Sequence, residues 1–184
     1  MRNQDFFNPL QILPDWLQFA LFMRFLDAPK PVPFSSSALR GQQLFGTSVG
    51  SPGIGCFTCH TPQMVTPPKS ETAALQNVTA NLFSDLLVHH MGKGLADDIT
   101  QGVATGDMFR STPLWGVGQR IFFLHDGRTS DLLQAIGAHF SSADNCREGH
   151  SPCYGASEAN AVITKFNALS AQDQQAILDF LRSL

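Results

Sequence analysis

Hydrophobic residues recur every three or four positions through the last third of the chain, which is the spacing of helices with one buried face. This pattern predicts helices over residues 130–140, 157–169 and 170–184, the last of them opened by Ser170 with Asp173 in its first turn. The chain contains no alternating strand pattern of useful length and no internal repeat. We therefore predict an all-α fold with long loops.

Two further helices are predicted nearer the N-terminus. The first spans residues 14–26 and is apolar on nearly all sides, so it requires a covering surface. A stiff proline-rich connector follows at residues 28–33. The second helix contains residues 40–45 and takes its N-cap from the serines at 35–37.

The proline-rich connector is the predicted domain boundary. It divides the chain into a linker helix with its connector, residues 1–33, and a single domain, residues 34–184. Within that domain, residues 46–55 and 61–83 are rich in Gly, Ser, Pro and Thr and predict loops. Residues 84–91 predict a short helix.

Composition narrows the classes of function. The net charge of the 184 residues is −3 with no basic stripe, so nucleic-acid binding is not expected. The most apolar run, residues 16–26, is interrupted by Gln18 and Arg24 and is shorter than the roughly 20 residues of a membrane-spanning helix, so no membrane span is expected. Fifteen Phe beside a single Tyr suit the lining of an apolar cofactor pocket.

Residues 56–60 have the sequence Cys-Phe-Thr-Cys-His and carry the strongest chemical signal in the chain. Two thiols at this spacing can each add to one vinyl group of a haem, and the adjacent histidine then lies beneath the iron. The alternative, half of a zinc site, lacks a second close pair of ligands. The motif predicts one covalent haem c attached through Cys56 and Cys59, with His60 as the proximal iron ligand and electron transfer as the chemistry.

The helix before this motif and the helix that closes the chain form the frame of a cytochrome c-like domain with long haem-wrapping loops. Gly41 allows the two helices to approach closely, and Phe45 and Phe180 are expected to pack where they cross.

The second axial ligand is less determined by the sequence. His139 continues the apolar stripe of its predicted helix and therefore faces inward, and Met91, at the end of another predicted helix, is the alternative. The remaining His and Met candidates in this half of the chain are His89, His90, Met108 and His125.

The other two cysteines and the N-terminal sequence indicate the cellular compartment in which the protein is expected. Cys146 and Cys153 bracket a short polar loop and predict a disulfide in an oxidising environment, the alternative being two free thiols. Haem attachment to a Cys-x-x-Cys-His run takes place in the periplasm or its equivalents, yet no export signal is visible in the sequence. We expect a bacterial periplasmic protein, of which this chain is one part.

Three motifs resemble those of di-haem oxidoreductases related to bacterial di-haem cytochrome c peroxidases. They are residues 87–97 (Leu-Val-His-His-Met-Gly-Lys-Gly-Leu-Ala-Asp), 109–118 (Phe-Arg-Ser-Thr-Pro-Leu-Trp-Gly-Val-Gly) and 124–128 (Leu-His-Asp-Gly-Arg). They stand in family order, and the similarity covers residues 35–184. These proteins have two haem domains, and the sequence is similar to the C-terminal one.

The resemblance implies roles for individual residues. The distal ligand of the C-terminal haem comes from the helix after the His-Asp-Gly motif, which corresponds to His139. Arg110, Arg120 and Arg128 could neutralise the haem propionates, and Arg110 is the best match to the family motif. Trp115 either packs near the haem or lies on an electron path. Calcium binds between the haems in several relatives, but its ligands come partly from the other domain, so no calcium site is predicted.

Two functions follow. The first is an electron-transfer haem domain, working with a redox partner protein or an N-terminal haem domain, because two strong axial ligands leave no open position for peroxide. The alternative is a stand-alone haem peroxidase that reduces hydrogen peroxide at a weakly ligated iron. The sequence identifies no catalytic residue and does not determine whether the chain is itself an enzyme.

Overall fold

The computed structural model describes residues 13–144 and 152–184. The elements in chain order are α1 (Asp15–Arg24), α2 (Ser36–Phe45), η2 (Cys56–Thr58), β1 (Met64–Val65), η3 (Ala73–Leu75), β2 (Thr79–Ala80), β3 (Val88–His90), β4 (Met108–Arg110), η4 (Val117–Gln119), α3 (Leu132–Gly137), α4 (Asn160–Asn167) and α5 (Ala171–Ser183). Here η denotes a single turn of 3-10 helix.

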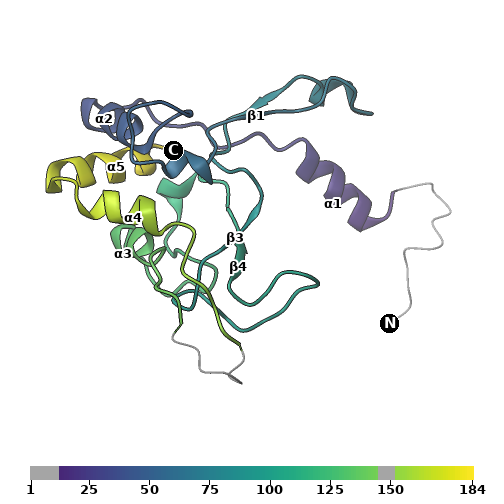
Figure 1. Ribbon diagram of the computed structural model, residues 1–184. Helices are drawn as coiled ribbons and strands as arrows, with labels where there is room; N and C mark the ends of the chain where they lie inside the picture. Colours follow the sequence, from purple (N-terminus) through teal and green to yellow (C-terminus); the bar gives the residue numbers. More distant parts are fainter. Residues whose placement is uncertain (1–12, 145–151) are drawn as a thin grey trace.

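The crossing of α2 and α5 is the centre of the hydrophobic core (Figure 1). Phe180 is fully buried, and its ring contacts Phe34, Phe45 and Phe83 with centroid separations of 5.4 to 5.7 Å and edge-on geometry. Edge-on aromatic packing is favourable beyond the area that it buries. The predicted contact between Phe45 and Phe180 at this crossing is confirmed.

Capping explains where three of the helices begin. The side chains of Ser35 and Ser170 accept hydrogen bonds from the backbone N–H groups three residues later, as the sequence predicts. Asp131 caps α3 in the same manner, accepting from the N–H groups of Leu133 and Gln134. The predicted helices in this half of the chain therefore form, although α3 and α4 are shorter than the apolar spacing indicates.

The prediction of an all-α fold is wrong. The part of the chain that the structure describes contains five α-helices together with two small antiparallel sheets, β1 with β2 and β3 with β4. Each strand is only two or three residues long. Such strands are held by pairing between distant parts of the chain, and they are too short to produce a period-two pattern in the sequence.

The predicted helix over residues 84–91 is also wrong. Phe83 and Leu86 have φ values of 53° and 61°, in the left-handed region, which interrupts any right-handed helix at this point. The chain then forms β3, in which His89 is the register partner of Phe109. Met91 consequently follows a strand and does not end a helix.

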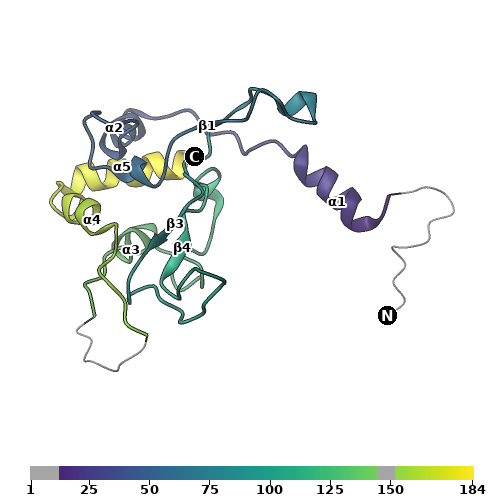
Figure 2. The same ribbon diagram turned by 45° about the vertical axis from the view of Figure 1, so that its right-hand side comes forward.

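Helix α1 projects from the core of the domain (Figures 1 and 2), and Arg24 at its end donates a hydrogen bond to Thr72 at 3.3 Å. It forms within the predicted segment but has no buried residue, and Trp16, Phe19 and Phe22 are all more than half exposed. The connector after it is attached to the domain by a hydrogen bond from the N–H of Val32 to the carbonyl of Ser183 at 2.9 Å. None of the described helices has the length and apolar character needed to cross a bilayer.

The contact at Gly41 makes the first testable prediction. A Cβ at this position would lie 1.9 Å from the carbonyl oxygen of Ala176 in α5, and backbone cannot move aside as a flexible side chain can. We expect Gly41→Ala to lower the free energy of unfolding by about 3 kcal/mol, measured by chemical denaturation.

Gly137→Ala is the matched control, because a Cβ at this helical position would meet nothing within 4 Å and the backbone there is not left-handed. Its effect should not exceed about 1 kcal/mol. Equal effects of the two variants would show that the crossing of α2 and α5 is looser than described.

Candidate haem site

A largely apolar cavity of about 480 Å³ lies between the C-terminal helices and the loops of the domain. Its volume falls within the range of about 300–1,000 Å³ that is typical of small-molecule and cofactor sites. Side chains from α2, α3, α4 and α5 form one part of its wall, and further parts come from η2, β3, β4 and the loop after η4.

The Cys-x-x-Cys-His segment lies in a tight turn at the edge of this cavity. Gly55 precedes it with a φ of 104°, a conformation that favours glycine, and η2 follows at once. The N–H of His60 donates to the carbonyl of Cys56 at 3.0 Å, which is the hydrogen bond of a single helical turn. Residues three and four positions apart in such a turn share one side, so Cys56, Cys59 and His60 all line the cavity.

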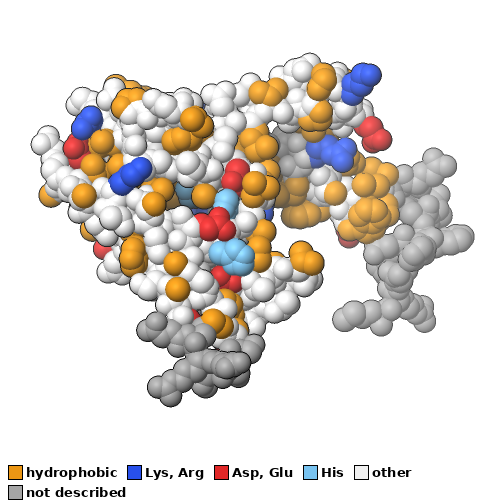
Figure 3. All heavy atoms as spheres, in the orientation of Figure 1, with side chains coloured by type: hydrophobic (Ala, Val, Ile, Leu, Met, Phe, Trp, Pro, Cys, Tyr) orange, Lys and Arg blue, Asp and Glu red, His pale blue; other side chains and the backbone are white. Residues whose placement is uncertain are grey.

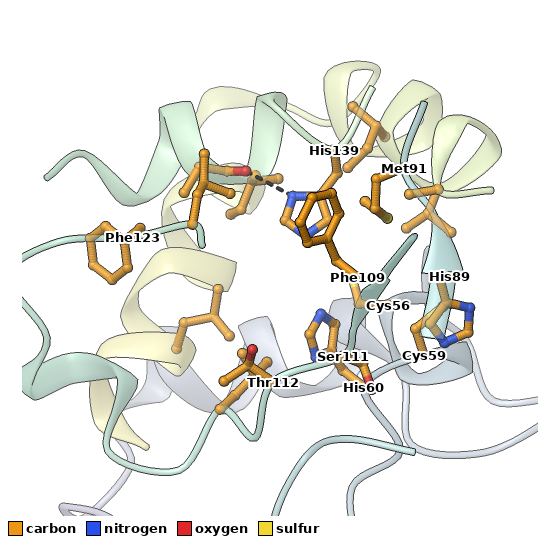
Figure 4. Close-up of a pocket in the computed structure, with 18 of the residues that line it drawn as sticks. Cys56, Cys59, His60, His89, Met91, Phe109, Ser111, Thr112, Phe123 and His139 are labelled. Atoms are coloured by element: carbon orange, nitrogen blue, oxygen red, sulfur yellow. Dashed lines mark hydrogen bonds between the residues drawn. The ribbon is translucent and has the colours of Figure 1, made fainter. Parts of the chain in front are cut away.

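His60 and His139 face one another across the cavity (Figure 4). Their ring centroids are 6.5 Å apart and their planes are inclined by 59°. An imidazole nitrogen binds a transition-metal ion at about 2 Å, and the ring centroid lies about 1 Å farther, so imidazoles on opposite sides of one ion have centroids about 6 Å apart. The observed separation therefore fits a single metal ion between the two rings.

Both histidines are oriented by backbone hydrogen bonds. Nδ1 of His60 donates to the carbonyl of Phe83 at 3.2 Å, and Nδ1 of His139 donates to the carbonyl of Ala135 at 2.8 Å. Because a carbonyl only accepts, the proton of each neutral ring lies on Nδ1, which leaves the lone pair of Nε2 unprotonated. Metal-binding histidines typically have such a carbonyl partner for the second ring nitrogen.

Burial favours the neutral form of both rings. It lowers the pKa of His60 to about 4, with a further contribution from the nearby His139. Burial also lowers the pKa of His139 below its ordinary value. A histidine must be neutral to bind a metal, so both side chains are ready to act as ligands at neutral pH.

Cys56 and Cys59 are free thiols at the same cavity. Burial raises the pKa of Cys56 to about 12 and raises that of Cys59 as well. Sulfurs held as neutral thiols are less suited to binding a cation than thiolates are, since the thiolate is the metal ligand. Their positions are suited to covalent attachment of a group that fills the cavity.

Most of the predicted site residues meet at this cavity. Arg110 and the alternative ligand Met91 line it together with the cysteine pair and the two facing histidines. Trp115 does not belong to the lining, although Leu114 before it and Val117 two positions after it do. In the pattern Leu-Trp-Gly-Val the aromatic residue is the prominent signal, but the leucine and the valine line the cavity.

The other histidine candidates for the distal position have different partners. His89 lies between two carboxylates, Asp85 and Glu158, and His90 pairs with Asp107. His125 stacks on Phe109 with ring centroids 4.2 Å apart. Sequence spacing does not reveal these contacts, because each partner lies at least four residues away and in three of the four pairs more than fifteen.

Cys153 is disulfide-bonded, whereas Cys146, the other half of the predicted pair, lies outside the described residues.

The donor set at the cavity fits a haem better than a bare metal ion. Within the described ranges, no group of three or more His, Cys, Asp or Glu side chains is arranged to hold a metal ion. A haem requires only two protein ligands, since the porphyrin supplies the other four donors, and two facing neutral imidazoles meet that requirement. The apolar wall and the adjacent cysteine pair suit the porphyrin and its attachment.

Comparison with known proteins agrees with this site. A sequence model for the family described as "Di-haem oxidoreductase, putative peroxidase" matches residues 30–184, and the chain therefore belongs to this family of haem oxidoreductases. Neither the curated proteins nor the solved structures include a significant match to the chain.

The buried His60 makes stability of the haem-free protein depend on pH. Its folded-state pKa of about 4 lies below the ordinary 6.5, so the unfolded chain binds the proton first as pH falls. Stability from this group is fully present above pH 6.5 and declines toward pH 4. We expect the contribution of His60 to the free energy of unfolding to fall by about 2 kcal/mol between pH 7 and pH 5, measured by denaturant titration.

His60→Gln is the comparison variant, because glutamine does not titrate in this window. The difference in unfolding free energy between the two proteins should change with pH as described. A difference that stays constant from pH 7 to pH 5 would mean that His60 is solvated and not buried.

Proposed function

We propose that the chain is a c-type haem electron-transfer domain. Cys56 and Cys59 attach one haem covalently, and His60 and His139 are the axial ligands of its iron. The observation that carries the proposal is the pair of facing imidazoles, 6.5 Å apart, each with Nδ1 bonded to a backbone carbonyl and Nε2 left for the metal.

The two histidines fill the ligand positions of the metal, and the residues around them exclude water from the site. A bound haem supplies a one-electron iron couple, and two strong imidazole ligands leave no vacant position on the metal. Apolar side chains from α3, α4 and α5 keep the two rings dry. Arg110 and Arg120 also line the cavity and provide positive charge for the haem propionates. A bis-histidine iron has a lower potential than one with a methionine ligand.

We further propose that this domain is the C-terminal half of a di-haem system. The family description specifies two haems, whereas this sequence contains a single Cys-x-x-Cys-His run. The partner is an N-terminal haem domain or a separate redox protein that supplies the second haem. Covalent haem attachment implies a periplasmic location in a bacterium.

The distal ligand can be tested with His139→Ala. We expect this variant to retain its covalent haem but to lose the low-spin, six-coordinate visible spectrum of the parent protein, because the iron then lacks its second strong ligand. Retention of the haem on a denaturing gel checks the attachment independently of the ligand.

Met91→Leu is the matched control, since it keeps a buried apolar side chain of similar volume at the same cavity. Its spectrum should match that of the parent. If Met91→Leu changes the spectrum and His139→Ala does not, the iron is bound by the thioether and the assignment of His139 is wrong.

A stand-alone peroxidase requires an open iron position, so peroxide distinguishes the two functions. We expect the spectrum of the oxidised chain to be unchanged by hydrogen peroxide. A high-spin parent spectrum that responds to peroxide would instead make this chain the enzyme on its own.

A further inference from the structure

His89 lies between two carboxylates at the edge of the haem cavity. Its Nε2 is 3.0 Å from Oδ2 of Asp85, and its Nδ1 is 2.9 Å from Oε2 of Glu158. The side chains of His89 and Asp85 are only 16% and 15% exposed, whereas Glu158 is about half exposed. Figure 3 shows histidine and acidic side chains gathered on the face of the molecule where β3 runs.

The same histidine contacts the cysteine pair. Nδ1 of His89 is 3.7 Å from Sγ of Cys59, and His89 and Glu158 both line the cavity. The backbone joins this contact as well, because the N–H of Asp85 donates to the carbonyl of Cys59 at 2.9 Å. His89 and Asp85 therefore connect this cluster directly to Cys59, and Glu158 joins it through His89.

The geometry indicates which form the ring takes. Ionised carboxylates only accept hydrogen bonds, so a ring with a carboxylate at each nitrogen donates from both nitrogens and is an imidazolium. Other donors hold the carboxylates in their ionised form: Ser111 and the N–H of Leu87 donate to Asp85, and the N–H of His90 donates to Glu158.

The ionisation equilibria agree with this geometry. Partial burial lowers the pKa of His89, but the hydrogen bonds that the ring donates to Glu158 and Asp85 outweigh it and raise the pKa above its ordinary value. The pKa values of both carboxyls are lowered, for Glu158 chiefly by its hydrogen bond with His89. With all three groups charged, the cluster has a net charge of −1.

We propose that His89 is a fixed cation beside the edge of the haem that is attached through Cys59. Its positive charge offsets the two carboxylates and raises the reduction potential of the iron. This inference rests on the proposed attachment of haem at Cys59. Reduction by an external one-electron donor adds one electron to the iron and transfers no proton to or from His89. The reduced haem carries one more negative charge than the oxidised haem, so a nearby cation favours it.

The adjacent histidine provides a matched control. His90 also pairs with a carboxylate, Asp107, at 3.0 Å, but its side chain is 49% exposed and does not line the cavity. Alternation along β3 directs the two rings to opposite faces of the strand. His90→Gln therefore removes a comparable histidine–carboxylate pair away from the haem.

The experiment is a spectroelectrochemical titration of the haem-loaded chain at neutral pH. We expect His89→Gln to shift the reduction equilibrium toward the oxidised form by about tenfold, which is 59 mV for a one-electron couple. Glu158→Gln should shift it in the opposite direction. The double variant His89→Gln, Glu158→Gln restores the net charge of −1 and should return the potential toward that of the parent.

Charge restoration distinguishes the proposal from a purely structural role, because removing a second hydrogen-bonding partner would not repair a structural defect. Equal potentials for parent and His89→Gln would overturn the inference, and so would an equal shift in His90→Gln. If His89→Gln fails to fold, Glu158→Gln provides the test. A reduction potential of Glu158→Gln at or below that of the parent then overturns the inference.

The outcome for the proposed function is separate. A parent chain without covalent haem contradicts the attachment itself, before any potential is measured. A parent chain with haem whose potential is indifferent to these charges leaves the attachment intact and removes only the role of His89.

Discussion

The close approach of α2 and α5 is the constraint on which the geometry of the site depends. A hydrogen atom at Gly41 lets the backbone of one helix meet that of the other, and this contact brings Phe45 against Phe180. The ring of Phe45 in turn lies 6.3 Å from that of His60. Helix α5 also supplies Ile177 and Leu181 to the cavity wall, so one crossing both supports His60 and encloses the cavity that this histidine lines.

Local signals in the sequence predicted the parts of the fold that depend on neighbours in the chain. Ser35 and Ser170 cap their helices, and the Cys-x-x-Cys-His turn and the inward direction of His139 follow from spacing alone. The sheets were missed, because two- and three-residue strands depend on pairing between distant segments. The exclusion of Trp115 from the cavity and the carboxylates around His89 likewise depend on tertiary packing, which no spacing rule encodes.

Three histidines that line the cavity illustrate how surroundings determine the chemistry of one residue type. His60 and His139 meet a backbone carbonyl at one nitrogen and an apolar cavity at the other, and this environment keeps them neutral. His89 meets a carboxylate at each nitrogen and is charged. A neutral ring can bind a metal ion and a cationic ring cannot, so the carboxylates of Asp85 and Glu158 make His89 unsuited to be a metal ligand.

The pairing of β3 with β4 has a consequence for how the chain can vary. In a strand that is three residues long, the register alone selects which of two consecutive histidines faces inward. A shift by one position would present His90 to the interior and turn His89, with its carboxylate partners, toward solvent. Met91 and Leu95, which follow β3, line the cavity, so changes in length are not expected there. Ile99 and Val103 are exposed, and a longer or shorter excursion around them leaves the ladder aligned. The register of the ladder therefore selects the inward histidine, and the exposed part of the loop between its strands is where the domain has room to diverge.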